Sequence, residues 1–540
     1  MSEYYIAYGG TAANKAAATG DGDISTFMSV GKHNSESFSP DDIIWISDFG
    51  GIIYGGLMNP PSAGTAGHTI KYKPVVSESP ILSGAMPVSG FEVDSGSRYV
   101  ATFVDSYVAR VFFDGVLGTA QASAGACTSD MDWFFDATPN QLYVYSTGGD
   151  PDTRWSLVEA SVENTAFSLN QDYIELDGIV ARHATYANFR GVACGNGVIM
   201  RNCVGYGSKY GTSFGDSSMS SAVSGYILED GVFYNNGEAG IQVEFRVYDS
   251  VIRRNETYGN YTTDTDWLKG IKIFDNTDLM QGIEIYENYV HDEKPDRSGD
   301  NQAKGCGIWV DAVKATSGNP VKIYNNYLNT CGGNGIFLEI CDHCLVYGNL
   351  LVDCATNTTG SVEFIPAGIK CDARYDFTCE NNLIYNNTII GGRASIAVTA
   401  YSLGSCEINN NIFKNNICSG YTYVALAAMR GGENDGTYGS GNVYNNNCFG
   451  VEDTDFIEWG ANTHYSTYDA WIAASSQTDN NIESDSSFTN AAGGDYSLAS
   501  DDPGIGQGED LGIPFNIGLM PETQAEDFPA NVVTGNRDIF

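Results

Sequence analysis

A short alternation of hydrophobic and polar positions recurs through the middle of the chain: a glycine, an aliphatic residue, any residue, a second aliphatic residue and then a polar one. Residues two apart in a β-strand share a face, so the two aliphatic side chains point to one side and the polar residue to the other. Strands that return every 27 to 49 residues and cannot close a core alone predict a solenoid. Copies begin at Gly191, Gly240, Gly270, Gly307, Gly335, Gly368 and Ser395.

A second strand that ends in asparagine follows each copy, as in the segment from Lys322 to Asn326. Asparagine tolerates the left-handed backbone conformation of a tight turn, and stacked side-chain amides can hydrogen-bond along a solenoid axis. The unequal steps predict loops of different length, of which 205–222 and 290–305 could wall a groove. The asparagines expected at this turn are Asn202, Asn255, Asn288, Asn326, Asn349, Asn387, Asn411 and Asn447.

The outward position after the second aliphatic residue is unusually acidic. The chain average of 67 acids in 540 residues predicts fewer than one acid in seven such positions, yet four are present. Carboxylates on neighbouring strands repel across about 4.8 Å, which favours function over structure as the reason for the column. In chain order the column is Gly195, Glu244, Phe274, Asp311, Glu339, Asp372 and Thr399.

Aromatic and cationic residues flank these acids. Trp309 and Phe337 occupy the outward position two residues earlier, together with Lys272 and Lys370. Apolar ring faces beside carboxylates suit sugars, although both rings could instead be covered as a secondary core. The candidate substrate-binding residues are Glu244, Arg246, Lys272, Trp309, Phe337, His343, Lys370, Asp372 and Arg374.

The repeats resemble the right-handed parallel β-helix family, which includes pectate-lyase-like enzymes, β-helix glycosidases and phage tailspikes. The resemblance covers most of residues 170–450 and, more loosely, 1–100. It implies an all-β, right-handed, single-stranded parallel β-helix that is capped at both ends. The expected parts are 1–104 as N-terminal cap and first coils, 105–170 as an irregular excursion packed on the solenoid, 171–450 as the core with its groove, and 451–540 as a C-terminal cap.

Asp311 and Glu339 are the candidate catalytic pair. Neighbouring coils place them about 4.8 Å apart at the backbone, close to the separation of about 5–5.5 Å that retaining glycosidases use. Repulsion between the two would raise one pKa and leave a protonated acid beside an ionised nucleophile. The phrases Gly307–Asp311 and Ile336–Glu339 resemble those of the β-helix β-xylosidases, which implies Asp311 as nucleophile and Glu339 as acid/base.

Two further residues have open roles in this reading. His343 follows the acid by four residues, and it either orients Glu339, binds substrate or serves as a hydrogen-bonded turn residue. Asp372 lies one coil beyond Glu339, where it would bind a sugar hydroxyl or form an inverting pair with Asp311 at about two coil spacings.

Two other functions stay open. A polysaccharide lyase would abstract a proton next to a uronate carboxylate, with Ca²⁺ held by the acid column and a lysine or arginine as base. The resemblance to alginate-lyase-like members fails where Glu244 and Phe274 stand in place of cations. A tailspike or adhesin that only binds glycan is the non-catalytic alternative. A hydrolase of this kind requires no cofactor, and Ca²⁺ is possible.

Composition restricts partners and location. A net charge of −40 argues against nucleic acid, and no apolar run is long enough to span a membrane. No signal peptide is visible, so we expect a secreted protein whose leader is missing from this chain, or a virion-associated one, as monomer or homotrimer. The 13 cysteines lack metal-site spacing and are interpreted mainly as core thiols, with the CxxC of Cys341 and Cys344 a weak redox signal.

Overall fold

The computed structural model describes residues 1–54, 56–192, 195–219, 221–261, 268–277, 279–294, 304–356, 365–401, 405–460, 462–477, 480–505 and 508–509. The chain divides into two compact units, which are described separately. The first is Met1–Val198 with Asn202–Ser213, and the second is Ile199–Arg201 with Phe214–Phe540. In the part of the chain that is described, no helix is long and apolar enough to cross a membrane.

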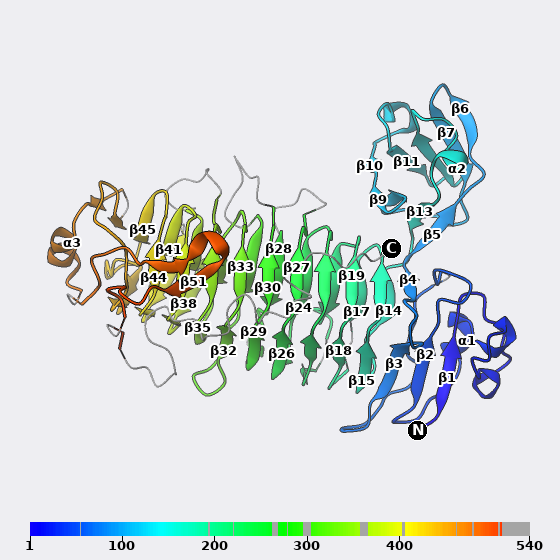
Figure 1. Cartoon of the computed structure of the whole chain (residues 1–540), viewed down its shortest axis with the longest axis horizontal. Coiled ribbons are helices and arrows are strands. Elements are labelled where there is room, and N and C mark those ends of the chain that lie inside the picture. Colours follow the sequence, from blue (N-terminus) through cyan, green and yellow to red (C-terminus); the bar gives the residue numbers. More distant parts are fainter. Residues whose placement is uncertain are drawn as a thin grey trace. The chain divides into compact units, whose positions relative to one another are not determined.

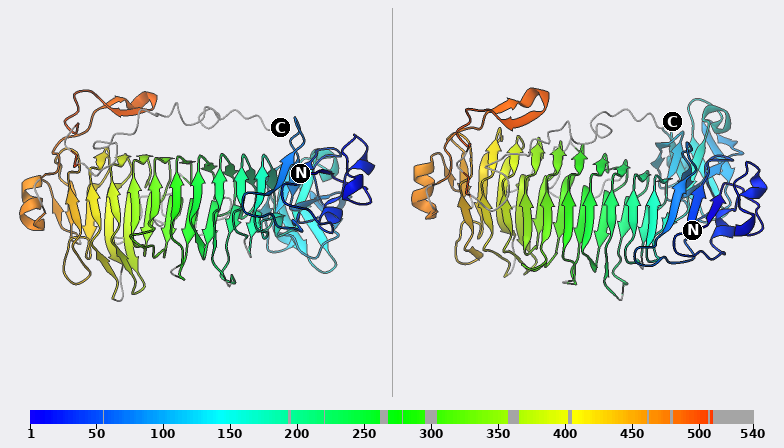
Figure 2. Two further views of the ribbon diagram at one scale, coloured as in Figure 1. Left: turned by 90° about the horizontal axis from the view of Figure 1, so that it is seen from below. Right: turned by 60° about the horizontal axis from the view of Figure 1, so that its bottom comes forward.

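The second unit is a parallel β-helix, in which each coil adds one strand to each of three sheets (Figures 1 and 2). The first sheet contains β18 (Ile199–Arg201), β22 (Ile227–Glu229), β26 (Ser250–Arg253), β29 (Ile283–Tyr286), β32 (Val321–Tyr324), β35 (Cys344–Tyr347), β39 (Leu383–Tyr385), β43 (Ile412–Lys414) and β47 (Val443–Asn445). The second contains β23 (Val232–Tyr234), β27 (Glu256–Tyr258), β30 (Tyr289–His291), β33 (Tyr327–Asn329), β36 (Leu350–Val352), β40 (Thr388–Ile390) and β44 (Ile417–Ser419). The third contains β24 (Ala239–Glu244), β28 (Lys269–Phe274), β31 (Cys306–Asp311), β34 (Ile336–Glu339), β37 (Ala367–Arg374), β41 (Ala394–Tyr401), β45 (Val424–Met429) and β48 (Ile457–Trp459).

The predicted register of the third sheet is confirmed from β24 to β41. The first aliphatic positions of the repeats pair strand by strand, as Ile308 does with Ile336, and they are fully buried. The glycine before them has a steric reason, because a Cβ atom on Gly307 would lie 2.7 Å from the backbone carbonyl oxygen of Gly335. Hydrophobic burial of this column therefore fixes which side chains face outward.

The expected alignment of the repeat is wrong at its earliest copy, which was predicted to begin at Gly191. β17 (Ala187–Gly191) ends at Gly191, so this glycine closes a strand rather than opening one. Gly195 is glycine for a different reason, since a Cβ atom there would lie 2.1 Å from the carbonyl oxygen of Gln171. The repeat pattern cannot distinguish a glycine required by a close backbone approach from one that marks a strand.

The asparagine ladder forms, but the residue that makes the ladder bond and the residue that takes the left-handed conformation are different. The side-chain amide of Asn326 donates to Oδ1 of Asn349 at 2.9 Å, and the preceding residue, Asn325, takes the left-handed conformation with φ 53°. Asn411 belongs to a second ladder with Asn382 and Asn442, and Asn416 occupies its expected place. The first ladder runs through Asn255, Asn288, Asn326, Asn349, Asn387, Asn416 and Asn447.

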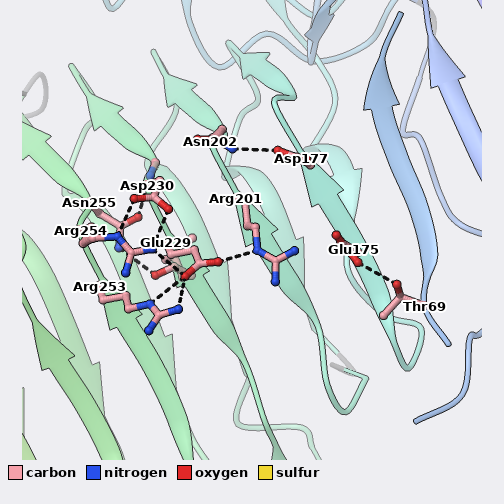
Figure 3. A network of polar contacts seen from close by, with 12 residues as sticks. Thr69, Glu175, Asp177, Arg201, Asn202, Glu229, Asp230, Arg253, Arg254 and Asn255 are labelled. Atoms are coloured by element: carbon pink, nitrogen blue, oxygen red, sulfur yellow. Dashed lines mark hydrogen bonds and ion pairs between the residues drawn. The ribbon is translucent and has the colours of Figure 1, made fainter. Parts of the chain in front are cut away.

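Arginines converge on one carboxylate at the outer face of the first sheet (Figure 3). Arg201, Arg253 and Arg254 all bind Glu229, and Arg254 also binds Asp230 at 2.8 Å. In the first unit Asn202, with φ 52°, donates to Asp177 at 2.8 Å and so does not continue the ladder.

The first unit begins with parallel coils and then leaves this pattern. From Ala85 to Ser161 the chain forms mainly antiparallel strands around a hydrophobic cluster of their own, so the expected excursion starts earlier than 105 and is regular. The parallel strands are β1 (Glu3–Ile6), β2 (Ile43–Ile46), β3 (Ile70–Pro74), β4 (Ile81–Ser83), β14 (Thr165–Ser168), β15 (Ile174–Asp177), β16 (Val180–Arg182), β17 and β19 (Val204–Tyr206). The excursion contains β5 (Ala85–Val88), β6 (Glu92–Ser95), β7 (Arg98–Thr102), β8 (Val111–Phe113), β9 (Val116–Leu117), β10 (Thr119–Ala120), β11 (Asp132–Asp136), β12 (Gln141–Tyr145) and β13 (Val158–Ser161), besides α2 (Pro151–Arg154), while α1 (Val30–His33) precedes β2.

Past β48 the parallel pattern ends. Helix α3 (Tyr468–Ser475) buries Trp471, whose ring centroid lies 5.7 Å from that of Trp459 and 5.9 Å from that of Phe449. The short strands β50 (Phe488–Asn490) and β51 (Asp495–Leu498) then pair in antiparallel fashion. Residues 510–540 of the expected cap lie outside the described residues.

All twelve cysteines that the structure describes are buried thiols. Cys341 and Cys344 of the CxxC are among them, which agrees with their interpretation as core residues.

Candidate active site

A cleft of about 550 Å³ opens on the outward face of the third sheet in the second unit. Strands β24, β28, β31 and β34 supply its floor, and the turn after β37 supplies part of its wall. Its charged lining residues are Glu244, Lys272, Asp311, Lys314 and Glu339, and its aromatic ones are Phe274, Tyr375 and Phe377.

The acid column has the register that the sequence predicts. Asp311 pairs with Glu339, and Glu339 pairs with Asp372, across β31, β34 and β37. The first two carboxylates line the same cleft, whereas Asp372 is fully buried and is not among the lining residues. Asp311 and Glu339 are therefore neighbouring acids of the column that both line the cleft.

Lys272 neutralises Asp311. Its Nζ lies 2.6 Å from Oδ2 of Asp311 and 3.8 Å from the ring centroid of Trp309. Lys272 stands on the preceding strand at the outward position paired with Trp309, so the sheet register brings the cation to the carboxylate. The contact is an ion pair at the edge of the cleft.

Glu339 has a different environment. It is 4 % exposed, and burial raises the pKa of its carboxyl to about 7; the positive charge of Arg374 opposes this rise, and the charges of Asp311 and Asp372 add to it. Arg374 Nε lies 3.0 Å from Glu339 Oε1 and 2.6 Å from Asp372 Oδ2, so one guanidinium holds both acids. At neutral pH a substantial share of Glu339 is protonated beside an ion-paired Asp311.

The expected aromatic floor is wrong. Trp309 is 1 % exposed and Phe337 is fully buried, and their rings stack on each other with centroids 5.4 Å apart. The faces that a sugar would use are occupied, because Lys272 lies over Trp309 and Arg374 lies 5.7 Å from the centroid of Phe337. These rings form a secondary core with Cys306 beneath the charged residues.

Two expected cations are not brought into the cleft. Lys370 is fully buried, its Nζ lies 3.5 Å from the carbonyl oxygen of Ile365, and burial lowers its pKa to about 8. Arg246 donates to the carbonyl oxygen of Met219. Neither residue is among those that line the cleft.

The other predicted site residues divide between cleft and turn. Glu244 lines the cleft and accepts a hydrogen bond from Gln242 at 2.7 Å. His343 has φ 54°, its backbone amide donates to the carbonyl oxygen of Glu380, and it is not a lining residue. Its geometry is that of a turn residue. Of the loops expected to wall a groove, residues 220 and 295–303 lie outside the described residues.

Sequence reasoning missed Lys314, Tyr375 and Phe377. Lys314 Nζ lies 3.0 Å from Asp342 Oδ1 and 2.7 Å from the carbonyl oxygen of Thr378, and it reaches the cleft from the turn after β31. Tyr375 and Phe377 are 68 % and 55 % exposed. The available signal was a pair of aromatic residues in a segment that the repeat places in a turn. Among the described side chains, no group of three or more His, Cys, Asp or Glu is arranged to hold a metal ion.

Comparison with known proteins shows the fold. No family model matches the chain, and no curated protein does. The solved structure of XylC in complex with xylose is similar with a TM-score of 0.60 at 14% identity, over 86% of this chain and 85% of that one. Pectate lyase Pel9A matches with a TM-score of 0.39 at 12% identity, over 96% of this chain and 94% of its own. An alginate lyase from Paenibacillus sp. matches with a TM-score of 0.37 at 12% identity, over 79% and 97%.

The protein is thus an all-β protein with the parallel β-helix fold, which confirms the resemblance seen in the repeats. At such low identity the chemistry has to be argued from the cleft.

Proposed function

We propose that the protein is a glycoside hydrolase that retains anomeric configuration, with Asp311 as nucleophile and Glu339 as acid/base. The observation that carries the proposal is the pairing of these two carboxylates on adjacent strands of one cleft in opposite electrostatic settings. Adjacent strands lie about 4.8 Å apart, near the carboxyl separation of about 5–5.5 Å in retaining enzymes.

The first step forms a glycosyl-enzyme. Glu339 donates its proton to the glycosidic oxygen, the bond between that oxygen and the anomeric carbon breaks, and a carboxylate oxygen of Asp311 bonds to the anomeric carbon. The leaving group departs as an alcohol. In the second step the ionised Glu339 takes a proton from water, the water oxygen attacks the anomeric carbon, and Asp311 is released as a carboxylate.

The ion pairs assign a role to each cation. Lys272 fixes the position of the Asp311 carboxylate, since its own Nζ is held against the Trp309 ring. Arg374 orients Glu339 through a 3.0 Å contact while Asp372 shares its charge, so the acid is held without being forced into its ionised form. Both are positioning residues.

A polysaccharide lyase is the second candidate. Lys370 favours it, because its pKa near 8, lowered by burial, is a value suited to a base. Against it, Lys370 is fully buried and does not line the cleft, and both lining lysines are bound to carboxylates. A uronate carboxylate would compete with Asp311 and Asp342 for those lysines.

We further propose an oligosaccharide or polysaccharide substrate and an extracellular or virion-associated location. A tailspike that binds glycan without cleaving it is the non-catalytic alternative.

The test incubates the protein with neutral and uronate-containing oligosaccharides, with and without EDTA. Because XylC was solved with xylose, xylose-containing glycans are the first to try. New reducing ends with retained configuration by NMR support the hydrolase. An ultraviolet-absorbing unsaturated uronate, lost with EDTA, would establish the lyase instead.

A further inference from the structure

Two exposed aromatic side chains stand at the rim of the cleft in a segment that no catalytic role uses. Tyr375 and Phe377 are 68 % and 55 % exposed, and both line the cleft that contains Asp311 and Glu339. Exposed aromatic residues are common on protein surfaces, but these two lie together in the lining of a cleft, where a ligand could cover them.

The turn that carries them is tightly constrained. Tyr375 and Asp376 have φ values of 55° and 66°, and the backbone amide of Phe377 donates to the carbonyl oxygen of Arg374 at 2.9 Å. A left-handed conformation is costly for a tyrosine. The Asp376 carboxylate accepts from the backbone amide of Ser405 at 2.7 Å, which fixes the middle of the turn.

Both ends of the turn are tied to the cleft. Arg374, at one end, contacts Glu339, and Thr378, at the other, accepts hydrogen bonds from Lys314 at 2.7 Å and 3.0 Å. The two rings are therefore displayed from a backbone that the site itself positions, as preorganised binding requires.

The location relative to the acid indicates what the rings meet. Along the third sheet the order is Asp311, Glu339, Asp372, and the turn continues directly from the strand of Asp372, next to that of Glu339. The acid gives its proton to the oxygen that leaves with the departing sugar. The departing sugar thus lies on the Glu339 side of the cleft, where the rings are.

We propose that Tyr375 and Phe377 form a stacking platform for the leaving-group sugar, so that the cleft takes a neutral di- or oligosaccharide through the apolar face of a pyranose ring. This rests on the proposed hydrolase function. The lining cations support an uncharged sugar, because Lys272 is bound to Asp311 and Lys314 to Asp342 at 3.0 Å.

The test compares substrates with and without a leaving-group sugar. The substrates are neutral disaccharides (xylobiose, cellobiose, lactose and maltose) and the glycosyl fluorides of their non-reducing sugars. The variants are Tyr375→Ala, Phe377→Ala and the ring-retaining Tyr375→Phe. Tyr107→Ala is the control, because Tyr107 is 56 % exposed and belongs to the first unit.

Each alanine variant is expected to lower kcat/KM for the disaccharide by about tenfold, mainly through KM, and to change it less than about twofold for the glycosyl fluoride. Tyr107→Ala should behave as the wild type, and Tyr375→Phe, which keeps the ring, should lose less than Tyr375→Ala. Equal losses on both substrates, or no loss on either, would overturn the platform.

A second measurement separates this proposal from the proposed function. If no disaccharide or fluoride is cleaved, the hydrolase reading fails, and binding of the same disaccharides is then measured by calorimetry. Binding that is weakened in Tyr375→Ala and Phe377→Ala, with Tyr107→Ala unchanged, would sustain the platform in a binding protein. Binding that is absent, or equal in all variants, would overturn it.

Discussion

Two parts of the third sheet share one architecture and differ in their outward residues. From β31 to β37 the outward column holds Asp311, Glu339 and Asp372, braced by Lys272 and Arg374. From β41 to β45 the same column continues as Thr399 and Met429. The neighbouring outward column there holds Ala397 and Ala427, which belong to a buried apolar cluster.

The coil therefore does not need charges at the outward positions of the third sheet. Inward aliphatic residues pair in unbroken register through both parts, so hydrophobic burial maintains the solenoid in each. Burying carboxylates in the first part costs desolvation energy that only paired cations offset. Residues that are costly for the fold and yet arranged around a cleft are best explained by chemistry.

The largest expected effect comes from replacing the two acids that line the cleft. Asp311→Asn and Glu339→Gln should each lower kcat by about a thousandfold, because each removes one partner in covalent or acid/base catalysis. Thr399→Val, in the same column but beyond the cleft, is the matched control and should retain activity. Steady-state kinetics measure the effect, and wild-type rates in both acid variants would show that neither carboxylate is catalytic.

The next effect concerns stability. Lys272→Met leaves Asp311, with a side chain 14% exposed, without its cation, and we expect a loss of about 2–3 kcal/mol in the free energy of unfolding. Adding Asp311→Asn should recover most of it, because the uncompensated charge is then gone. Denaturant melts of the two single variants and the double variant measure the coupling. Additive losses would mean that the ion pair contributes nothing to the fold.

A buried acid elsewhere in the coil gives a smaller, pH-dependent effect. Glu293 is fully buried at the end of an asparagine ladder, where it accepts from the amide and side chain of Asn260 at 2.9 and 2.8 Å. Burial raises its pKa to about 7, so the stability it contributes is present below its unfolded pKa and is lost as pH rises through about 7. Glu293→Gln should stabilise the protein by about 1–2 kcal/mol at about pH 9 and change little at about pH 5.

Thermal melts at both pH values test this, with the exposed Glu3→Gln as control. A variant that is equally destabilised at both pH values would show that Glu293 is needed as a carboxylate.

The smallest expected effect concerns the influence of Asp372 on the pH dependence of activity. Glu339 must be protonated to act, so activity should fall as pH rises through its pKa of about 7. Asp372→Asn removes a negative charge that raises this pKa and leaves Arg374 more available to Glu339, so the alkaline limb of the kcat/KM profile should move to lower pH. A limb that moves to higher pH would contradict the assignment.

The sequence predicted the solenoid, the register and the pairing of Asp311 with Glu339 across neighbouring strands, because strand alternation determines which residues share a face. It left open whether Trp309 and Phe337 face a substrate or are covered, since the alternation says which way a ring points and not whether a lysine or arginine lies across it. Gly191 and Asn411 were misplaced because glycine and asparagine serve several turn positions in each coil. Tyr375 and Phe377 belong to a turn, which the repeat leaves unspecified.

The most direct test of the account is to trap the covalent intermediate. A 2-fluoro glycosyl fluoride of the preferred sugar slows both steps, and the second more, so the sugar should remain on the nucleophile. Peptide mass spectrometry should then find one added fluorosugar on the peptide that contains Asp311, in the wild type and not in Asp311→Asn. A label on another carboxylate, or a product of inverted configuration with no label, would contradict the account.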